Sequence, residues 1–391
     1  MALTSIRTNG DDIEIVDQLL LPHTVAWVAI KSPDDAYTAI KSMMIRGAPA
    51  IASLAALSVS SYLSRALEEE PRPAFLTSYQ LLEDHLSPIL AHLYASRPTA
   101  VNLGAAITRL QGVLAAGRAE ARKGPTDEQT SLAITVKNLI AEGRAVADED
   151  VGRNKIMGQL GADWILRKAE ENHQDITEGL NILTVCNTGS LATSGYGTAL
   201  GIITRLHEMG KLKRALLTAL ELKTLSIPST MICDSMVGSC FQHYPIHASW
   251  GQIGLQAMVT LQTRAPSCAI RGCLPSLNPG PLDPRWVRVS EQADVRCQPN
   301  PGFSLSIPIE YRPPIEACLA RGRVVGGLDP TIAPNAQAVV QITPDLALND
   351  GGVFNPSFDV TPAALISAVV TEKGVAERTA EASIIQVGNI S

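Results

Sequence analysis

Residues 182–201, ILTVCNTGSLATSGYGTALG, place a cysteine between a short aliphatic run and a turn of small residues. The aliphatic run predicts a strand over 181–185, and the segment 192–209 after the turn predicts a helix. A second strand-like run follows at 227–233. This alternation of strand and helix favours a parallel sheet covered by helices. Ligands of such sheets bind beyond the carboxyl ends of the strands, which is where Cys186 lies.

The first third of the chain has a different pattern, which is mainly helical after a small β element. Ile13–Val16 follows an Asn-Gly turn and predicts a strand. Ser32, Pro33 and two acidic residues form a strong helix start, and a second, apolar helix is expected over 50–66. Further helices are expected over 77–93, 100–121 and, with a break or two, 127–170. We therefore predict an α/β protein with a mainly helical N-terminal domain, 1–130, and a Rossmann-like parallel-sheet domain, 131–391.

Composition excludes several classes of function. The net charge is −6 and no basic run occurs, which argues against nucleic acid as a partner. No apolar span reaches about 20 residues, so no membrane partner is expected. The N-terminus has no secretory pattern, and the seven cysteines show no CxxC pair, which is typical of a reducing compartment. Histidine spacing shows no metal motif, and no nucleotide-binding motif is found, so we expect no metal and no cofactor.

Two segments carry candidate binding chemistry. A thiol that faces a helix N-terminus is favoured as thiolate, and the amides after Gly189, beside Ser190, could hold a phosphate. The plainer interpretation is that Cys186 is a small buried strand residue. Arg46-Gly47-Ala48-Pro49 lies between two apolar helices, where the guanidinium could bind phosphate or could simply lie at the surface. Arg97, before Pro98, is a similar candidate.

Together, several stretches resemble the methylthioribose-1-phosphate isomerase family. They are IVDQLLLP, AIKSMMIRGAPAI, SRPTAVNL, TVCNTGSLATSGYGTALG, LTALEL, DSMV and FNPSFDVTP. The resemblance covers residues 1–214 and about 305–391, and the regulatory subunits of translation initiation factor 2B share the fold. It implies conversion of 5-methylthioribose 1-phosphate to 5-methylthioribulose 1-phosphate in methionine salvage.

The resemblance also implies the parts of the site. Cys186 matches the family's catalytic cysteine, whose partner is the aspartate of a Gly-Ala-Asp-Arg motif. The substrate, a small sugar phosphate, is held by Arg46-Gly47-Ala48 and Arg97, to which we add Gly189 and Ser190. No metal or organic cofactor is implied, and family members form homodimers. We expect a cytoplasmic protein, with the nucleus as a second location.

Two family segments are missing from this chain. Arg214-Ala215-Leu216 runs directly into Leu217, where a Pro-Tyr-x-Gln-Gly-x-Arg loop is expected. The aspartate motif is also absent. Residues 266–301 hold seven prolines in 36 positions, too many for a central strand or helix.

A shifted reading frame accounts for the second gap. Triplets that start at the third nucleotide of each codon, from Trp250 onward, allow Gly-Ala-Asp-Arg. After three further codons they allow Asn-Gly-Asp-Thr-Ala-Asn-Lys, with the family's spacing, and both forced positions are the required glycines. We interpret about 245–305 as the catalytic segment read out of frame.

Three readings of function stay open. The first is the isomerase, with this exact chain poorly folded at about 240–305 and weakly active or inactive. The second is a non-catalytic homologue of the initiation factor 2B regulatory type. The third is a related ribose-phosphate isomerase.

Overall fold

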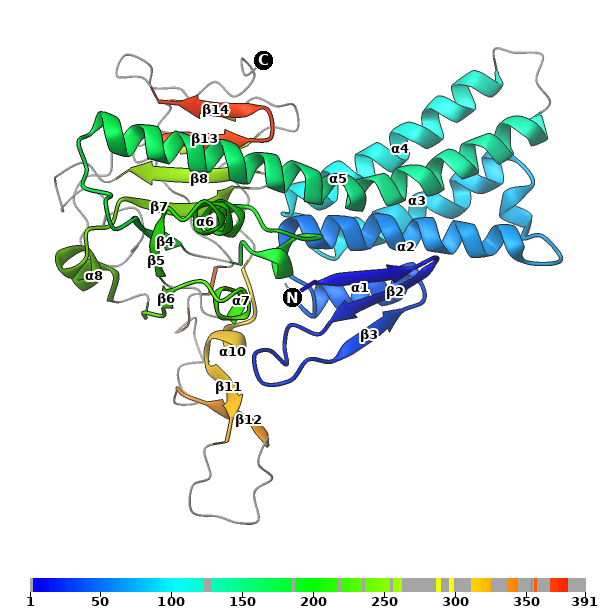
Figure 1. The fold of residues 1–391 in the computed structure, drawn as a ribbon. Coiled ribbons are helices and arrows are strands. Elements are labelled where there is room, and N and C mark those ends of the chain that lie inside the picture. The colour runs from blue at the N-terminus through cyan, green and yellow to red at the C-terminus, as the bar shows by residue number, and fades with distance from the viewer. Residues whose placement is uncertain are drawn as a thin grey trace.

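The computed structural model describes most of the N-terminal half of the chain and parts of the C-terminal half. The described residues are 3–122, 128–184, 187–216, 220–233, 236–253, 256–261, 286–289, 295–298, 311–324, 336–343, 353, 355–356 and 366–378. A helical part with a small sheet lies beside a part built on a larger sheet, and the long helix α5 runs through both (Figure 1).

The N-terminal part combines a three-stranded antiparallel sheet with a helical bundle. The sheet has the order β1-β2-β3, with β1 (Ile6–Asn9), β2 (Asp12–Val16) and β3 (Trp27–Ile30). The helices are α1 (Pro33–Lys41), α2 (Ala48–Glu68), η1 (Ala74–Leu76), α3 (Tyr79–Ala95), α4 (Val101–Ala121) and α5 (Glu128–Glu171). The predicted cap of α1 is confirmed, since the Ser32 hydroxyl accepts from the Asp35 amide at 3.1 Å. The predicted breaks in 127–170 are not found, because α5 is continuous.

Helix α2 forms the centre of the N-terminal core. Among the described residues it is the one helix long and apolar enough to cross a membrane, but 78% of its apolar window is buried inside the protein. Its alanines allow close packing, and the Gly143 Cα lies where a Cβ would come within 2.6 Å of the Ala56 carbonyl oxygen. The apolar character of α2 is therefore explained by burial among neighbouring helices.

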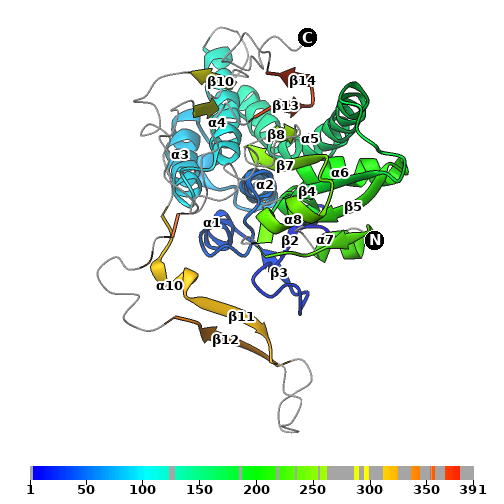
Figure 2. The same cartoon turned by 90° about the vertical axis from the view of Figure 1, so that its left-hand side faces the viewer.

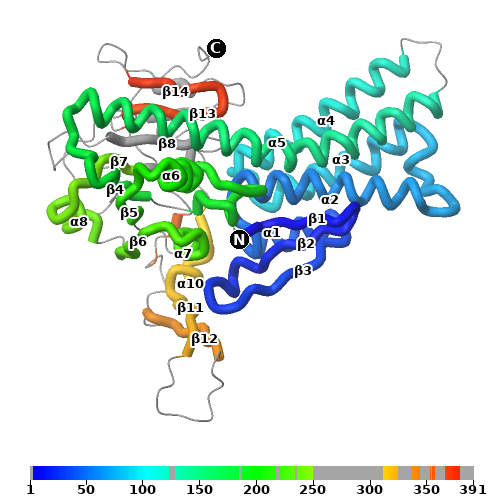
Figure 3. The backbone as a smooth tube through the Cα atoms, viewed as in Figure 1, coloured from blue at the N-terminus to red at the C-terminus, as the bar shows by residue number. Residues whose placement is uncertain are grey.

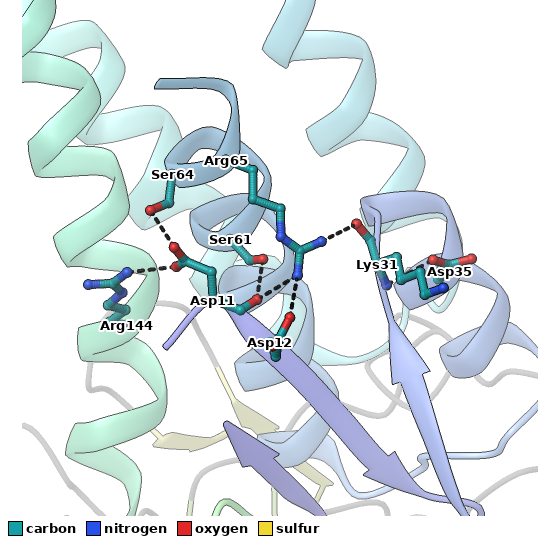
Figure 4. Close-up of polar contacts among 8 residues, drawn as sticks. All are labelled: Asp11, Asp12, Lys31, Asp35, Ser61, Ser64, Arg65 and Arg144. Carbon is teal, nitrogen blue, oxygen red and sulfur yellow. Dashed lines mark hydrogen bonds and ion pairs between the residues drawn. The ribbon is translucent and has the colours of Figure 1, made fainter. Parts of the chain in front are cut away.

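A polar cluster fastens the β1–β2 turn to two helices (Figure 4). The Asp11 carboxylate accepts from Ser64 Oγ at 2.6 Å and from Arg144 Nη2 at 2.7 Å. The Asp11 carbonyl accepts from Ser61 Oγ at 2.6 Å and Arg65 Nη2 at 2.9 Å. Burial acts to raise the pKa of Asp11, but these hydrogen bonds and the two arginine charges hold it below its ordinary value. The small sheet is thereby fixed against α2 and α5.

The C-terminal part is built on a seven-stranded sheet of order β14-β13-β8-β7-β4-β5-β6. Its strands are β4 (Leu180–Thr184), β5 (Leu212–Leu216), β6 (Ser229–Thr230), β7 (Ala248–Ile253), β8 (Gln256–Leu261), β13 (Ala368–Thr371) and β14 (Gly374–Glu377). The accompanying helices are η2 (Ser190–Ala192), α6 (Ala199–Glu208), α7 (Leu220–Thr224) and α8 (Val237–His243). Helix α6 and the C-terminal half of α5 pack together over the sheet (Figures 1 and 2).

Two further hairpins lie outside this sheet. Strands β9 (Trp286–Val289) and β10 (Val295–Gln298) pair with each other, as do β11 (Leu319–Arg323) and β12 (Gln337–Gln341). The short helix α10 (Pro314–Ala317) precedes β11, and the β11–β12 hairpin extends away from the body in both views (Figures 1 and 2).

The predicted fold class is confirmed, since a mainly helical N-terminal part is followed by a part built on a parallel sheet. Several details differ from the prediction. Strands β7, β4, β5 and β6 pair in parallel, whereas the pairs β7–β8, β8–β13 and β13–β14 are antiparallel and extend the sheet at one side. The helix predicted over 192–209 begins only at Ala199, and the strand predicted over 227–233 is reduced to β6. Thr361-Pro362 predicts the start of a helix over 363–370, but residues 368–370 form part of β13, and 363–365 lie outside the described residues.

The stretch expected to be poorly folded, about 240–305, is partly regular. Helix α8 and strands β7 and β8 are formed, and β7 and β8 join the main sheet. The expectation is therefore wrong for these elements. Residues 262–285 and 299–310 lie outside the described residues. Within 266–301, β9 and β10 form a separate two-stranded sheet and contain no proline.

The hydrophobic core falls into two main clusters. One cluster draws its buried residues from Ile6 to Ala147, and another runs from Met157 to Val370. Helix α5 contributes to both clusters, as its path through the molecule shows (Figure 3). The boundary at 130 stays a prediction, because a single helix joins the two cores.

Candidate active site

The predicted substrate-holding segment Arg46-Gly47-Ala48 lies at the N-terminus of α2. Gly47 is the N-cap residue and makes no side-chain capping hydrogen bond. The first amides of a helix have no acceptor within the helix, and the helix dipole favours an anion there. Arg46 is exposed beside this position. The segment therefore has the properties of an anion site on a 21-residue helix.

Arg97 comes to the same place from another part of the chain. It lies in the connection before α4, and its Nη1 donates to the Arg46 carbonyl oxygen at 3.4 Å. The structure thus brings together Arg46, Gly47, Ala48 and Arg97, which the sequence predicted as one substrate-binding group. The Arg97 guanidinium therefore lies beside the residue that precedes the N-cap of α2, and a guanidinium there suits the binding of a phosphate.

The turn after β4 lies directly against this segment. Cys186 itself lies outside the described residues, and the structure resumes at Asn187. A Cβ placed on Gly47 would lie 2.1 Å from the Ala192 Cα and 2.2 Å from its carbonyl oxygen. This approach allows no side chain at position 47. The N-terminus of α2 and the turn that follows Cys186 are therefore in direct backbone contact.

A buried carboxylate, Glu221, holds the turn from the side of the main sheet. Glu221 Oε1 accepts from Ser190 Oγ at 3.0 Å and from the Leu191 amide at 2.8 Å, and Glu221 is 5% exposed. A Cβ on Gly189 would lie 2.2 Å from Glu221 Oε2, so a side chain at position 189 would have to displace the Glu221 carboxylate. Burial raises the pKa of Glu221, and the hydrogen bonds from residues 190 and 191 oppose that rise.

Side chains from the helical part hold the same turn from the other side. Gln18 Nε2 donates to the Leu191 carbonyl oxygen at 2.7 Å, and Ser5 Oγ donates to the Thr193 carbonyl oxygen at 2.5 Å. Asp150 Oδ2, on α5, accepts from the Ser194 amide at 2.7 Å. Burial raises the pKa of Asp150, against hydrogen bonds from Ser194 and Asn154. The turn is therefore fixed by both parts of the molecule.

These contacts change the interpretation of Gly189 and Ser190. The Leu191 amide donates to Glu221, the Ala192 amide to the Gly189 carbonyl at 3.0 Å, and the Ser194 amide to Asp150. The donors that the sequence suggested for a phosphate are thus already paired within the protein. Substrate contact by Gly189 and Ser190 stays a prediction, whereas the N-terminus of α2 is the better-founded anion site.

Sequence reasoning missed three residues that shape the site. Gln18, Glu221 and Asp150 are each less than 10% exposed and each bind the turn through hydrogen bonds. Gln18 and Glu221 lie within IVDQLLLP and LTALEL, which served only as marks of resemblance. A charged residue in a short apolar helix was the available signal for Glu221, because buried carboxylates need hydrogen-bond donors.

No cluster of three or more His, Cys, Asp or Glu side chains occurs in the part of the chain that the structure describes. The described cysteines Cys233, Cys240 and Cys318 are free thiols. The absence of a metal and of a cofactor stays a prediction.

The sequence of this chain is similar to that of a known protein family and of curated relatives. The model of the initiation factor 2 subunit family matches residues 44–248 and 326–378. The methylthioribose-1-phosphate isomerase of Laccaria bicolor is 50% identical over 394 residues, which cover 96% of each chain.

Two solved structures have a similar fold. The crystal structure of 5-methylthioribose 1-phosphate isomerase from Pyrococcus horikoshii superposes with a TM-score of 0.62, at 23% identity, over 96% of this chain and 92% of that one. Subunit delta of translation initiation factor eIF-2B from A. fulgidus gives 0.59, at 26% identity, over 97% of both chains. With the match to the Laccaria enzyme over nearly its whole length, the chain belongs to the methylthioribose-1-phosphate isomerase family, within the wider initiation factor 2 subunit family.

Proposed function

We propose that this protein is the isomerase that converts 5-methylthioribose 1-phosphate to 5-methylthioribulose 1-phosphate in methionine salvage. The observation that carries the proposal is the backbone contact between Gly47 and Ala192. This contact supports an anion site with Arg46 and Arg97 that lies beside the turn following Cys186. A sugar phosphate is the class of substrate that needs both groups.

The proposed reaction is an aldose-to-ketose isomerisation. The sugar ring opens, one hydrogen moves from C2 to C1, C2 is oxidised and C1 is reduced, so no external oxidant is required. The N-terminus of α2, with Arg46 and Arg97, holds the phosphate and fixes the sugar against Cys186. Cys186 either stabilises the transition state or carries a proton. Its partner, the aspartate of Gly-Ala-Asp-Arg, is absent from the printed sequence.

The missing aspartate supports the second part of the proposal, the shifted reading frame. The family model matches up to residue 248 and again from residue 326, and the interval between includes the proposed shifted stretch. We propose that the catalytic form carries Gly-Ala-Asp-Arg in this interval. We further propose that it forms a homodimer and works in the cytoplasm, with the nucleus as a second location.

A regulatory role is the second candidate function. The similarity to initiation factor eIF-2B subunit delta, at 26% identity over 97% of both chains, favours it. A non-catalytic homologue would keep the fold and lose the catalytic aspartate, as the printed chain has. The third candidate, a related ribose-phosphate isomerase, would act on a different sugar phosphate. The same turnover assay with other ribose phosphates distinguishes it from the methylthioribose-1-phosphate isomerase.

Turnover of 5-methylthioribose 1-phosphate tests the proposal. We expect the chain encoded by the restored frame to be active and Cys186→Ser to lower its kcat by at least about 10²-fold, a loss typical of removed acid–base chemistry. The printed chain should be weaker by about the same factor or more, since it lacks the aspartate. Equal activity of the two chains would contradict the shifted-frame account, and an inactive restored chain would favour the regulatory reading.

A further inference from the structure

Gln18 is a buried side chain that the proposed reaction does not use directly. It follows β2 by two residues and is 2% exposed. Its Nε2 donates to the Leu191 carbonyl oxygen at 2.7 Å, and its Oε1 accepts from Asn187 Nδ2 at 3.3 Å. One amide group therefore binds the first described residue after Cys186 and the residue four positions further on.

The backbone of Gln18 is tied to the other half of the site. Its amide donates to the Met44 carbonyl oxygen at 2.9 Å, two residues before Arg46. Ile45, the residue between them, is fully buried in the N-terminal core. The position of Gln18 thus sets the position of the chain that leads into the N-terminus of α2.

Gln18 accordingly connects the two segments that the substrate would touch. The segment 44–48 is bound through the Gln18 backbone, and the turn 187–191 is bound through its side chain. A buried amide that is fully hydrogen-bonded fixes both partners in one relative position, because an unpaired buried donor or acceptor costs about 1–3 kcal/mol. An apolar residue of the same size would fill the space without this fixed relation.

We propose that Gln18 is a positioning residue that couples the phosphate-binding segment 44–48 to the turn that follows Cys186. The inference rests on the proposed function, because it assumes that a phosphate binds at the N-terminus of α2. It assigns to Gln18 the relative placement of the segment 44–48 and the turn 187–191. It gives Gln18 no contact with the substrate.

The test uses the full printed chain, with inorganic phosphate as the probe, and measures two quantities. Calorimetry gives the Kd for phosphate, and mass spectrometry of the peptide that contains Cys186 gives its alkylation rate by iodoacetamide. Gln18→Leu is expected to raise the Kd about tenfold and to speed alkylation several-fold, because the turn 187–191 loses its link to the segment 44–48, which stays bound to the backbone of residue 18. Arg46→Ala is expected to raise the Kd and leave the alkylation rate unchanged.

Two further variants control the experiment. Gln129→Leu removes an exposed side-chain hydrogen bond to the Thr77 carbonyl at 2.8 Å, at the N-terminal end of α5, and should change neither quantity. Gln18→Glu keeps the shape of the side chain and the acceptor for Asn187, but sets a carboxylate oxygen against the Leu191 carbonyl in place of the Nε2 donor. It should show both changes, and its melting curve separates a local change from loss of the fold.

The outcomes separate the two claims. Phosphate binding that depends on Arg46 but not on Gln18, or an alkylation rate that Gln18→Leu leaves unchanged, would overturn the coupling and leave the anion site standing. Absence of saturable phosphate binding by the wild-type chain would overturn the anion site and the coupling with it. A raised Kd and faster alkylation of Cys186 in the two Gln18 variants, with both quantities unchanged in Gln129→Leu, would establish the coupling.

Discussion

Gly47→Ala is expected to destabilise the protein strongly and to abolish phosphate binding at the N-terminus of α2. The added Cβ would lie 2.1 Å from the Ala192 Cα, 2.2 Å from its carbonyl oxygen and 2.4 Å from its carbonyl carbon. All three atoms belong to the backbone, so no side-chain rotation relieves the overlap. The turn must move away from α2, at a cost of about 3 kcal/mol by analogy with overpacked cores.

The same movement separates the two halves of the site. A displacement of about 1 Å in a positioned group can lower catalysis by about 10²-fold.

Urea unfolding measures the loss of stability in Gly47→Ala, and calorimetry measures its loss of phosphate binding. Gly112→Ala is the matched control, because a Cβ at this exposed position in α4 has nothing within 4 Å. It should be neutral or slightly stabilising, since alanine is favoured over glycine inside helices. Equal stability of Gly47→Ala and the wild type would show that the two segments are not in contact.

Glu221→Ala is expected to loosen the turn and lower the free energy of unfolding by about 2–4 kcal/mol. The variant leaves the Leu191 amide and the Ser190 hydroxyl without their acceptor, and each unpaired buried group costs about 1–3 kcal/mol. A cavity adds to the loss, and removal of a buried charge reduces it. Urea unfolding measures the change. Glu14→Ala, which removes only an exposed ion pair with Arg7, should have a small effect.

The isosteric variant Glu221→Gln tests the protonation of this group. Because burial raises the pKa of Glu221 above its ordinary value of 4.5, the folded state retains the proton more strongly than the unfolded state does. The stability contributed by this group is complete below pH 4.5. It falls as the pH rises from 4.5 through the raised pKa of Glu221 in the folded state. Glu221→Gln removes this fall, so the difference in stability between variant and wild type should shift in favour of the variant with rising pH. A difference in the free energy of unfolding that stays constant from about pH 4 to about pH 7 would contradict a raised pKa for Glu221.

Local sequence signals were sufficient for the helical part. The Ser32-Pro33 start of α1 and the apolar run of α2 depend on residues that are neighbours in the chain, and both helices occur where they were predicted. The cluster Arg46, Gly47, Ala48 and Arg97 was also predicted as one group, through resemblance. Its proximity follows from the structure, in which the residues that precede α2 and α4 meet.

Local sequence patterns gave a wrong prediction where contacts with residues distant in the sequence determine the backbone conformation. The helix predicted from residue 192 begins at Ala199, because Tyr196 and Gly197 adopt positive φ angles of 69° and 86°. Asp150 on α5 binds the Ser194 amide and stabilises this non-helical path. The glycines at 195 and 197 were a signal for a turn that the apolar pattern outweighed.

The residues that hold the turn could not be found from spacing. Gln18, Asp150 and Glu221 lie 173, 44 and 30 positions from their partners along the chain. No periodicity links such residues, because their contacts arise only when the two parts of the protein pack together. The mixed order of the sheet has the same origin, since β13 joins β8 from more than a hundred positions away.

Sequencing the transcript across the codons for Lys213 to Glu310 tests the central claim most directly. That claim is that the chain descends from an active isomerase whose catalytic segment is here read in a shifted frame. The account predicts reads that encode Gly-Ala-Asp-Arg and, three codons later, Asn-Gly-Asp-Thr-Ala-Asn-Lys, with a Pro-Tyr-x-Gln-Gly-x-Arg loop before LTALEL. A transcript that encodes the printed sequence throughout this interval would contradict it, and Cys186 would then be a remnant in a binding or regulatory protein.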